Sequence, residues 1–162
     1  MMQGSKVGLL LGSISLALIL GALGFQYIGH YPPCELCHWQ RWPHIASAVV
    51  GLGGGLLVRS GILGPGLGKP LAALTVLLVA IAGALGVYHA GVEWHFWLGP
   101  QHCTGDAYHF TGGKLDFNAP VVMCDRAAWR LFGISMAGYN AVISLVAAGM
   151  GTYMLAQSDR RA

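Results

Sequence analysis

Three long stretches of the sequence contain no charged residue, and this feature restricts the possible folds more than any other. They cover residues 7–28, 71–91 and 133–155. With a rise of about 1.5 Å per residue, a helix of this length crosses a hydrocarbon core of roughly 30 Å. A secretory signal has a shorter apolar region, of about 7–15 residues, so the first stretch is predicted to be an uncleaved span.

The composition excludes the other broad classes of protein. Only 9% of the residues are charged and 55% are hydrophobic, whereas a soluble domain has roughly 25% charged residues. Disorder requires low hydrophobicity and a high net charge, which this chain does not have. The formal net charge of +3 is too small and too scattered to indicate nucleic-acid binding. The chain is therefore predicted to be an integral membrane protein.

A further span is less obvious, because the apolar stretch over residues 44–58 is short. It reaches spanning length only if the helix begins near residue 38 and includes Arg41, with Pro43 close to its start. We therefore predict an all-α integral membrane protein, a bundle of four transmembrane helices in a single domain over residues 1–162. The predicted spans are residues 7–28, 38–58, 71–91 and 133–155.

The connections between these spans are predicted at residues 29–37 and 92–132 on one side, and in a Gly/Pro-rich loop on the other. The second long loop begins with the aromatic stretch 92–98, which suits a membrane–water interface and predicts a short interfacial helix. Gly8/Gly12 and Gly51/Gly55 have the spacing of close helix contacts. In such a glycine-rich chain, that spacing only weakly indicates a particular contact.

Basic residues predict how the helices are oriented in the membrane. The side with both termini carries a single acid, Asp159, and five basic residues: Lys6, Arg59, Lys69, Arg160 and Arg161. The other side carries four basic residues, Arg41, Lys114, Arg126 and Arg130, together with five acids: Glu35, Glu93, Asp106, Asp116 and Asp125. The positive-inside rule then places both termini in the cytoplasm.

All four cysteines fall in the two loops on the non-cytoplasmic side. That compartment is oxidising in bacteria, where an even number of cysteines predicts disulfides. A disulfide between Cys34 and Cys37 closes too short a loop to add much stability, whereas this spacing at a helix N-terminus suits redox chemistry. We therefore predict a redox-active pair at Cys34 and Cys37. Cys103 and Cys124 form either a second redox pair or a structural disulfide.

Two polar residues of the spans are candidates for a cofactor site. Arg41 follows Cys37 by one helical turn, so its charge can stabilise the Cys37 thiolate or a negatively charged group in the bilayer. The alternative is that Arg41 extends to the lipid headgroups. His89, near the end of the third span, lies at a similar depth on the same side, where it is either a site residue or an ordinary interfacial histidine.

These residues also resemble a known family. The segments PPCELCHWQRWPH, GVEWHFWLGPQHCTG and VVMCDRAAWRLFGISMAGYN are similar to those of the disulfide bond formation protein B (DsbB) family, which are quinone-dependent thiol oxidases of the bacterial inner membrane. The resemblance covers most of the chain, roughly from Cys34 to Ala141. The spacing of the motifs, their order along the chain and the expected membrane topology all agree with this resemblance. The loop between Cys103 and Cys124 is shorter than in the enterobacterial members.

The resemblance implies a role for each site residue. Cys34 and Cys37 are expected beside a quinone, ubiquinone or menaquinone, while Cys103 and Cys124 face a periplasmic DsbA-like protein with a thioredoxin fold. Cys103 is expected to form the mixed disulfide with that partner. The resemblance also assigns Arg41, and less securely His89, to the quinone site. Both disulfides are expected in the resting protein, and no metal is expected.

Other interpretations of the cysteines remain open. The segment from Cys34 to His38 also spells a c-type haem attachment motif, which would make the chain a membrane-anchored electron carrier. A zinc site formed by the cysteines and His102 is a further alternative, although disulfides are favoured in this compartment. Vitamin K epoxide reductase-like proteins also combine a Cys-X-X-Cys pair with a quinone. In those proteins the loop cysteines precede the pair, whereas here they follow it.

Overall fold

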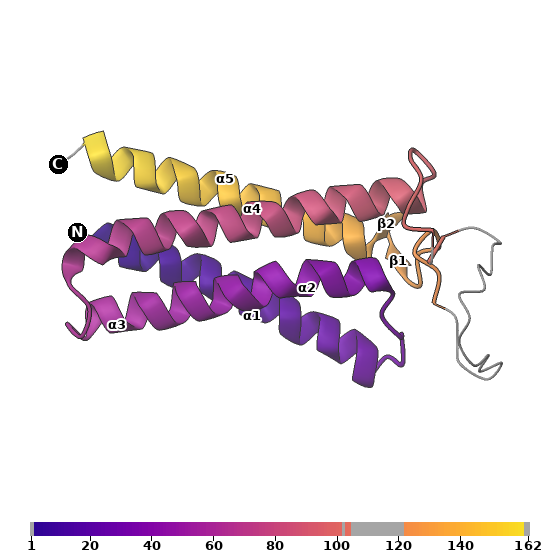
Figure 1. The fold of residues 1–162 in the computed structure, drawn as a ribbon, viewed down its shortest axis with the longest axis horizontal. Coiled ribbons are helices and arrows are strands. Elements are labelled where there is room, and N and C mark those ends of the chain that lie inside the picture. Colours follow the sequence, from indigo (N-terminus) through magenta and orange to yellow (C-terminus); the bar gives the residue numbers. More distant parts are fainter. Residues whose placement is uncertain (1, 102, 105–121, 161–162) are drawn as a thin grey trace.

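Long helices that lie alongside one another form most of the chain, as Figure 1 shows. The structure, a computed structural model, describes residues 2–101, 103–104 and 122–160. The long helices are α1 (Met2–Tyr27), α4 (Gly68–Glu93) and α5 (Met136–Arg160), and a 3₁₀ turn, η2 (Pro65–Leu67), precedes α4. The predicted helical class is confirmed.

The predicted second span is a composite helix. α2 (Glu35–Ala48), the π-helical segment η1 (Val49–Gly54) and α3 (Gly55–Arg59) follow one another without a break. The helix begins earlier than predicted because Cys34 caps it: the Cys34 Sγ accepts a hydrogen bond from the Cys37 N–H. As a result, Pro43 lies inside α2 and not near its start.

Within the described residues, three helical segments are long and apolar enough to cross a membrane. They are Gln3–Tyr27, Pro65–Glu93 and Met136–Ser158, which contain most of the predicted spans 7–28, 71–91 and 133–155. The composite helix is not among them. Its α2 segment turns polar side chains inward, since Gln40, His44 and Ser47 are buried.

The loop after α4 differs from the prediction where the structure describes it. Val92 and Glu93 still belong to α4, and residues 94–101 form turns and irregular backbone instead of an interfacial helix. A short hairpin of β1 (Arg130–Leu131) and β2 (Ile134–Ser135) then leads into α5. Its turn residues, Phe132 and Gly133, both have positive φ, as a two-residue hairpin turn of type I′ requires. Residues 105–121 of the predicted loop lie outside the described residues.

Glycines bring α1 close to the composite helix. A Cβ atom added to Gly51 would lie 2.5 Å from the carbonyl oxygen of Gly8 and 3.0 Å from the Cα of Gly12. Side chains are excluded at such distances, so the two backbones approach each other only because these positions are glycine. The spacing of Gly8, Gly12 and Gly51 in the sequence thus corresponds to a real contact.

The chain termini and the cysteines lie at opposite ends of the helical bundle. Figure 1 shows the start of α1 and the end of α5 at one end, with the α3–α4 connection beside them. The start of α2, the end of α4 and the hairpin lie at the opposite end. Cys34 and Cys37 lie at the start of α2, and Cys103 and Cys124 lie in the connection between α4 and the hairpin. The fold therefore gathers the cysteines at the end away from the termini.

Candidate active site

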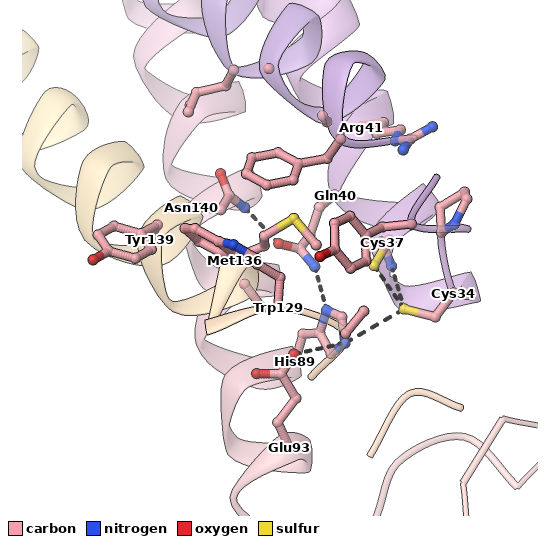
Figure 2. A pocket seen from close by; sticks show the side chains of 18 of the residues that line it. Cys34, Cys37, Gln40, Arg41, His89, Glu93, Trp129, Met136, Tyr139 and Asn140 are labelled. Atoms are coloured by element: carbon pink, nitrogen blue, oxygen red, sulfur yellow. Dashed lines mark hydrogen bonds and ion pairs between the residues drawn. The ribbon is translucent and has the colours of Figure 1, made fainter. Parts of the chain in front are cut away.

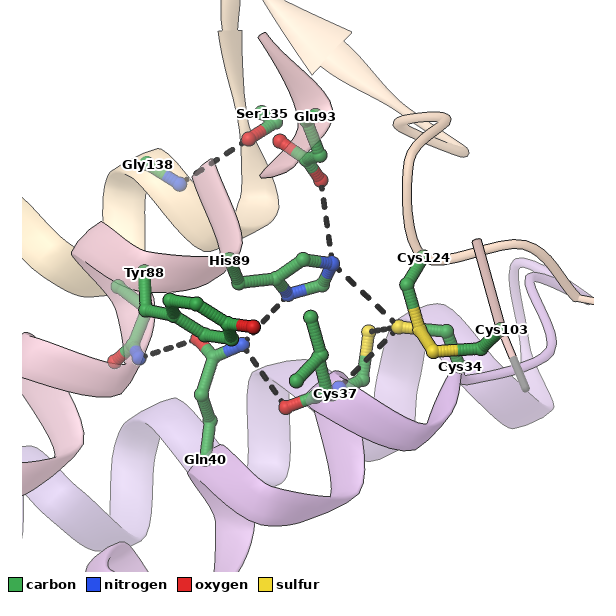
Figure 3. A network of polar contacts seen from close by, with 12 residues as sticks. Cys34, Cys37, Gln40, Tyr88, His89, Glu93, Cys103, Cys124, Ser135 and Gly138 are labelled. Carbon is green, nitrogen blue, oxygen red and sulfur yellow. Dashed lines mark hydrogen bonds and ion pairs between the residues drawn. A yellow bond between two sulfur atoms is a disulfide. The ribbon is translucent and has the colours of Figure 1, made fainter. Parts of the chain in front are cut away.

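The two cysteine pairs meet in one buried cluster. Cys103 and Cys124 form a disulfide, and both pack with Cys34, Leu36 and Val92. A backbone hydrogen bond also joins the two residues of this disulfide, since the Cys124 N–H donates to the Cys103 carbonyl oxygen. In Figure 3, Cys34 lies between this disulfide and His89. The two cysteine pairs are therefore neighbours within one cluster.

The two cysteines at the start of α2 are not joined by a disulfide in the structure. The Sγ atoms of Cys34 and Cys37 are 2.8 Å apart, and both residues are free cysteines. We expected both pairs to be disulfides at rest, but the structure contains only the Cys103–Cys124 disulfide. It therefore combines a disulfide in the loop with two free cysteines, the reduced pair, on α2.

The two thiols of the reduced pair differ in acidity. A hydrogen bond from the Cys34 thiol lowers the pKa of Cys37, and the charge of Arg41 acts in the same direction, although burial opposes both. The same hydrogen bond raises the pKa of Cys34, and burial raises it further. Cys37 is therefore the more acidic thiol of the reduced pair, and Cys34 is the less acidic one.

Arg41 is held by a neighbouring helix. Its Nη1 donates a hydrogen bond to Gln26 Oε1 at the end of α1, 2.7 Å away. The side chain is half-buried and follows Cys37 by one turn of α2. This position keeps the guanidinium close enough to Cys37 to act on its pKa.

A cavity of about 420 Å³ opens beside the reduced pair. Its walls come from α1, α2, α4, α5 and the loop that carries Cys124, and they are mostly apolar (Figure 2). The polar side chains along it include Cys37, Arg41, His44, His89 and Asn140. A cavity of this size and character, with few polar groups, is typical of a small-molecule site.

The structure places His89 against a sulfur as well as beside the cavity. Its Nε2 lies 3.6 Å from the Cys34 Sγ and 3.7 Å from Glu93 Oε1, while its Nδ1 lies 2.7 Å from Gln40 Nε2. His89 is only 3% exposed. The predicted neighbourhood of Arg41, His89 and the cysteines is thus present, but His89 also contacts Cys34, which the sequence did not reveal.

Four polar residues of the site were not predicted as such: Gln40, His44, Glu93 and Asn140. All except Asn140 are buried, and they link α2, α4 and α5 through side-chain contacts. A signal did exist in the sequence, because polar residues within predicted membrane spans are costly and usually functional. Glu93 had been counted only as one of the loop charges.

The haem interpretation does not agree with this geometry. Thioether attachment requires both sulfurs of the motif to face one haem, but Cys34 is 5% exposed and packs against the Cys103–Cys124 disulfide. His102, which the zinc interpretation would require, lies outside the described residues.

A helical chain with three membrane-length apolar helices and a disulfide packed against a second cysteine pair defines a class: membrane thiol–disulfide oxidoreductases. The family model described as "Disulfide bond formation protein DsbB" matches residues 5–154. The chain therefore belongs to the DsbB family of membrane proteins for disulfide bond formation.

Individual relatives agree with this assignment. The chain is 33% identical to a disulfide bond formation protein B of Burkholderia thailandensis over 145 residues, covering 82% of this chain and 78% of the relative. It is 32% identical over 97 residues to the protein of that name from Burkholderia pseudomallei, covering 59% and 52%. An uncharacterized protein of Rickettsia prowazekii is 25% identical over 146 residues, covering 86% and 80%. No solved structure matches the chain.

Proposed function

We propose that the protein reoxidises a periplasmic DsbA-like thiol oxidase and passes the electrons through its two cysteine pairs to a membrane quinone. The observation that carries this proposal is the position of the reduced pair. Cys34 packs against the Cys103–Cys124 disulfide, and both Cys34 and Cys37 line the cavity that contains Arg41. One cysteine pair thus connects a disulfide in the loop with an apolar site in the helical bundle.

In the first step, a thiolate of the reduced partner attacks the Cys103–Cys124 disulfide. We assign the mixed disulfide to Cys103, so that the electron pair of the broken bond stays on Cys124. The second thiol of the partner then attacks the mixed disulfide. This attack forms a disulfide within the partner and releases Cys103 as a thiol. The loop pair has gained two electrons and the partner has lost two.

In the second step, the loop pair becomes oxidised again by exchange with a Cys34–Cys37 disulfide. A loop thiolate attacks Cys34, which faces the loop pair, and Cys37 leaves as the thiolate. The lowered pKa of Cys37 makes it the better leaving group of the two. When the loop disulfide closes, Cys34 is released and the two electrons are held by the pair on α2.

The residues around the cavity fit a quinone. When bound, a quinone accepts the two electrons and two protons that oxidation of the Cys34–Cys37 dithiol releases. Arg41 provides a positive charge and hydrogen-bond donors beside the mostly apolar walls, which suit a ring with polar oxygens and an apolar tail. His89, which also lines the cavity, is a further candidate contact. Ubiquinone and menaquinone both satisfy this description.

We further propose four membrane spans, with residues 38–58 of the composite helix α2–η1–α3 as the second, so that Cys34 and Cys37 lie just outside it. Both termini would then lie in the cytoplasm of a bacterium and the cysteines in the periplasm. The common position of the termini and the basic residues Lys6, Arg59, Lys69 and Arg160 near that end support this orientation. Reporter fusions after Ala162 and after Gly112 test it, because only the second should be active in the periplasm.

The function can be tested with the purified protein in detergent, a reduced DsbA-like protein and a soluble quinone. We expect one quinone to be reduced for each partner disulfide formed, and Cys37→Ser to abolish quinone reduction. Ser60→Ala, which removes an exposed hydroxyl after α3 at the other end of the bundle, serves as a control. Mass spectrometry of extracted lipid should find a co-purified quinone. Partner oxidation that continues without any quinone under anaerobic conditions would contradict the proposal.

A further inference from the structure

Two amide side chains in the bundle have orientations that their backbone partners determine. Asn140 Nδ2 lies 3.1 Å from the Ala82 carbonyl oxygen, and Gln40 Nε2 lies 3.1 Å from the Leu36 carbonyl oxygen. A backbone carbonyl can only accept a hydrogen bond, so the nitrogen of each amide must face it. Asn140 Nδ2 also donates to Gln40 Oε1 at 2.7 Å, which is consistent with both orientations.

The orientation of Gln40 fixes the protonation of His89. Gln40 Nε2 donates to His89 Nδ1 at 2.7 Å, so Nδ1 must offer a lone pair and cannot carry a proton. The neutral ring therefore carries its proton on Nε2. An imidazolium ring would place a second N–H group against the Gln40 N–H group, so the contact also disfavours the charged form of His89.

The His89 Nε2–H group faces Cys34 Sγ at 3.6 Å and Glu93 Oε1 at 3.7 Å, and the ring also forms a hydrogen bond with the Cys124 backbone. The Cys37 backbone N–H approaches the same sulfur at 3.3 Å from the helix N-terminus. Two N–H donors, one from α4 and one from α2, thus converge on Cys34, which is itself buried (Figure 3). Such an arrangement stabilises a thiolate at that sulfur.

We propose that Gln40 and Asn140 are positioning residues that hold His89 in its Nε2–H tautomer, so that His89 donates a hydrogen bond to Cys34 whenever Cys34 is released as a thiolate. This inference rests on the proposed function, in which Cys34 is the sulfur that exchanges with the loop pair. His89 then acts directly on a reacting atom, and Gln40 and Asn140 act through His89.

The step that this hydrogen bond assists is balanced in electrons and atoms. In the mixed disulfide between Cys34 and one loop cysteine, the thiolate of the other loop cysteine attacks its loop neighbour. The Cys103–Cys124 bond forms, the bond to Cys34 breaks, and the electron pair of the broken bond stays on the Cys34 sulfur. At this moment the sulfur gains a full negative charge in a buried position, and the Nε2–H of His89 is aimed at it.

The charged groups around Cys34 show why a donor is needed there. The side-chain hydrogen bond with Cys37 raises the pKa of Cys34, burial raises it further, and the charges of Cys37 and Glu93 act in the same direction. Arg41 on α2 acts on Cys37, and Arg130 on β1 acts on Glu93. Asp125 follows Cys124 in the loop. In the described part of the chain, the N–H groups recorded at this sulfur are those of His89 and Cys37, and the Cys37 thiol also lies against it.

The same tautomer argues against a metal site. One possible ligand atom from each of Cys34, Cys37 and His89 lies within 4.8 Å of the others, a spacing that a metal ion could bridge. A histidine that binds a metal through Nε2 normally donates its Nδ1–H to an acceptor. Here Gln40 presents a donor to Nδ1, so Nε2 holds a proton and has no lone pair for a metal.

The tautomer can be measured directly in the wild-type protein. ¹⁵N NMR of the histidine-labelled protein in detergent should show His89 with a protonated Nε2 and an unprotonated Nδ1, its signals identified by their loss in His89→Gln. In Gln40→Glu, where a carboxylate accepts from Nδ1, we expect the protonated nitrogen to be Nδ1. Gln157→Glu near the C-terminus is the matched control and should leave His89 unchanged. A protonated Nδ1 in the wild type, or stoichiometric Zn²⁺ binding by the reduced protein, would overturn the proposal.

The effect on Cys34 can be measured in a chain with Cys37→Ser, Cys103→Ser and Cys124→Ser, which leaves one thiol. The rate of alkylation by iodoacetamide as a function of pH gives the thiol pKa. His89→Gln keeps an N–H group at the Nε2 position and should match the parent, whereas His89→Asn reaches only the Nδ1 position. We expect His89→Asn to raise the midpoint by about one pH unit, a tenfold loss of thiolate below it.

Equal midpoints in the parent, His89→Gln and His89→Asn would refute the role of His89. Neither measurement needs a quinone or a partner protein. If both give the expected result while quinone reduction fails, the proposed function is wrong and the tautomer remains correct. If quinone reduction succeeds and the midpoints are equal, only this inference is wrong.

Discussion

Arg41 Nη1 donates a hydrogen bond to Gln26 Oε1 across 2.7 Å, and this contact joins α2 to α1 while Arg41 also lines the cavity. An arginine that extended to lipid headgroups would have no need of a partner on a neighbouring helix. The contact therefore favours a guanidinium that is held at the site. It also means that the charge acting on Cys37 is fixed in position by two helices.

The first prediction concerns this charge. Arg41→Met keeps the apolar stem and removes the cation, so we expect the apparent KM for quinone to rise and kcat/KM to fall. Losing one comparable donor in a buried site costs about 2.7–4 kcal/mol, or roughly a factor of 10²–10³. Arg41→Lys should recover only part of the loss, because an ammonium group lacks the planar fork. Steady-state kinetics at varied quinone concentration measure both effects.

Arg59→Met is the control for this experiment, since Arg59 ends α3 at the other end of the bundle. It should leave the kinetics unchanged. Wild-type kinetics in Arg41→Met would remove Arg41 from the site. A silent Arg41→Lys together with poor expression of Arg41→Met would instead support a headgroup contact.

The second prediction follows from the acidity of the reduced pair. The hydrogen bond from Cys34 and the charge of Arg41 lower the pKa of Cys37, so its thiolate persists to lower pH than that of an ordinary cysteine. Iodoacetamide should therefore modify Cys37 before Cys34 at neutral pH, with a midpoint below about 8.5. Peptide mass spectrometry at a series of pH values distinguishes the two sites.

Removing Arg41 should move this midpoint upward, because the thiolate loses a favourable charge. The intact Cys103–Cys124 disulfide provides an internal control, since it should remain unmodified throughout. Faster modification of Cys34 than of Cys37 at neutral pH would show that the assignment of the thiolate is reversed.

Sequence spacing was sufficient to predict the parts of the site that depend on local chain geometry. The helical turn between Cys37 and Arg41 is one such feature, and the length of the apolar stretches is another. The start of the second helix was placed too late because the capping of α2 by Cys34 is a contact of a sulfur, which carries no strong cap signal in the sequence. The predicted loop helix is not seen over residues 94–101, because Val92 and Glu93 at the start of that stretch continue α4 instead.

The contacts between helices could not be predicted in the same way. Gln40 and His89 are 49 residues apart, and Gln40 and Asn140 are 100 apart. Whether such side chains meet depends on how each helix is rotated about its axis, which packing between helices determines. Polar residues inside the spans indicate that contacts exist, but one sequence does not show which residues pair.

The third prediction concerns the contact of α1 with the composite helix. In Gly51→Ala the new methyl group would lie 2.5 Å from the Gly8 carbonyl oxygen, so the helices must move apart. Overpacking of this kind typically costs 1–3 kcal/mol, and we expect a lower midpoint of thermal unfolding in detergent. Gly53→Ala is a matched control in the same π-helical segment, because its Cβ would meet no atom within 4 Å. Equal unfolding temperatures for the two variants would show that the close approach is absent.

The last prediction distinguishes the roles of the two loop cysteines. If Cys103 accepts the attack of the DsbA-like partner, Cys124→Ser leaves the reaction without the thiol that completes exchange with the inner pair. The mixed disulfide between Cys103 and the partner should then accumulate, and alkylation followed by non-reducing electrophoresis should show it as a band of combined mass. Cys103→Ser removes the attacked sulfur, so neither this band nor oxidation of the partner is expected.

The pair on α2 is the internal control for both variants, because a quinone should still oxidise Cys34 and Cys37 in each of them. This separates loss of the loop pair from loss of the fold, since an unfolded chain could not oxidise its inner pair with quinone. A Cys103→Ser protein that oxidises its partner at the wild-type rate would mean that the Cys103–Cys124 disulfide is structural. The partner would then have to react with Cys34 directly, although this sulfur is buried beneath the loop disulfide.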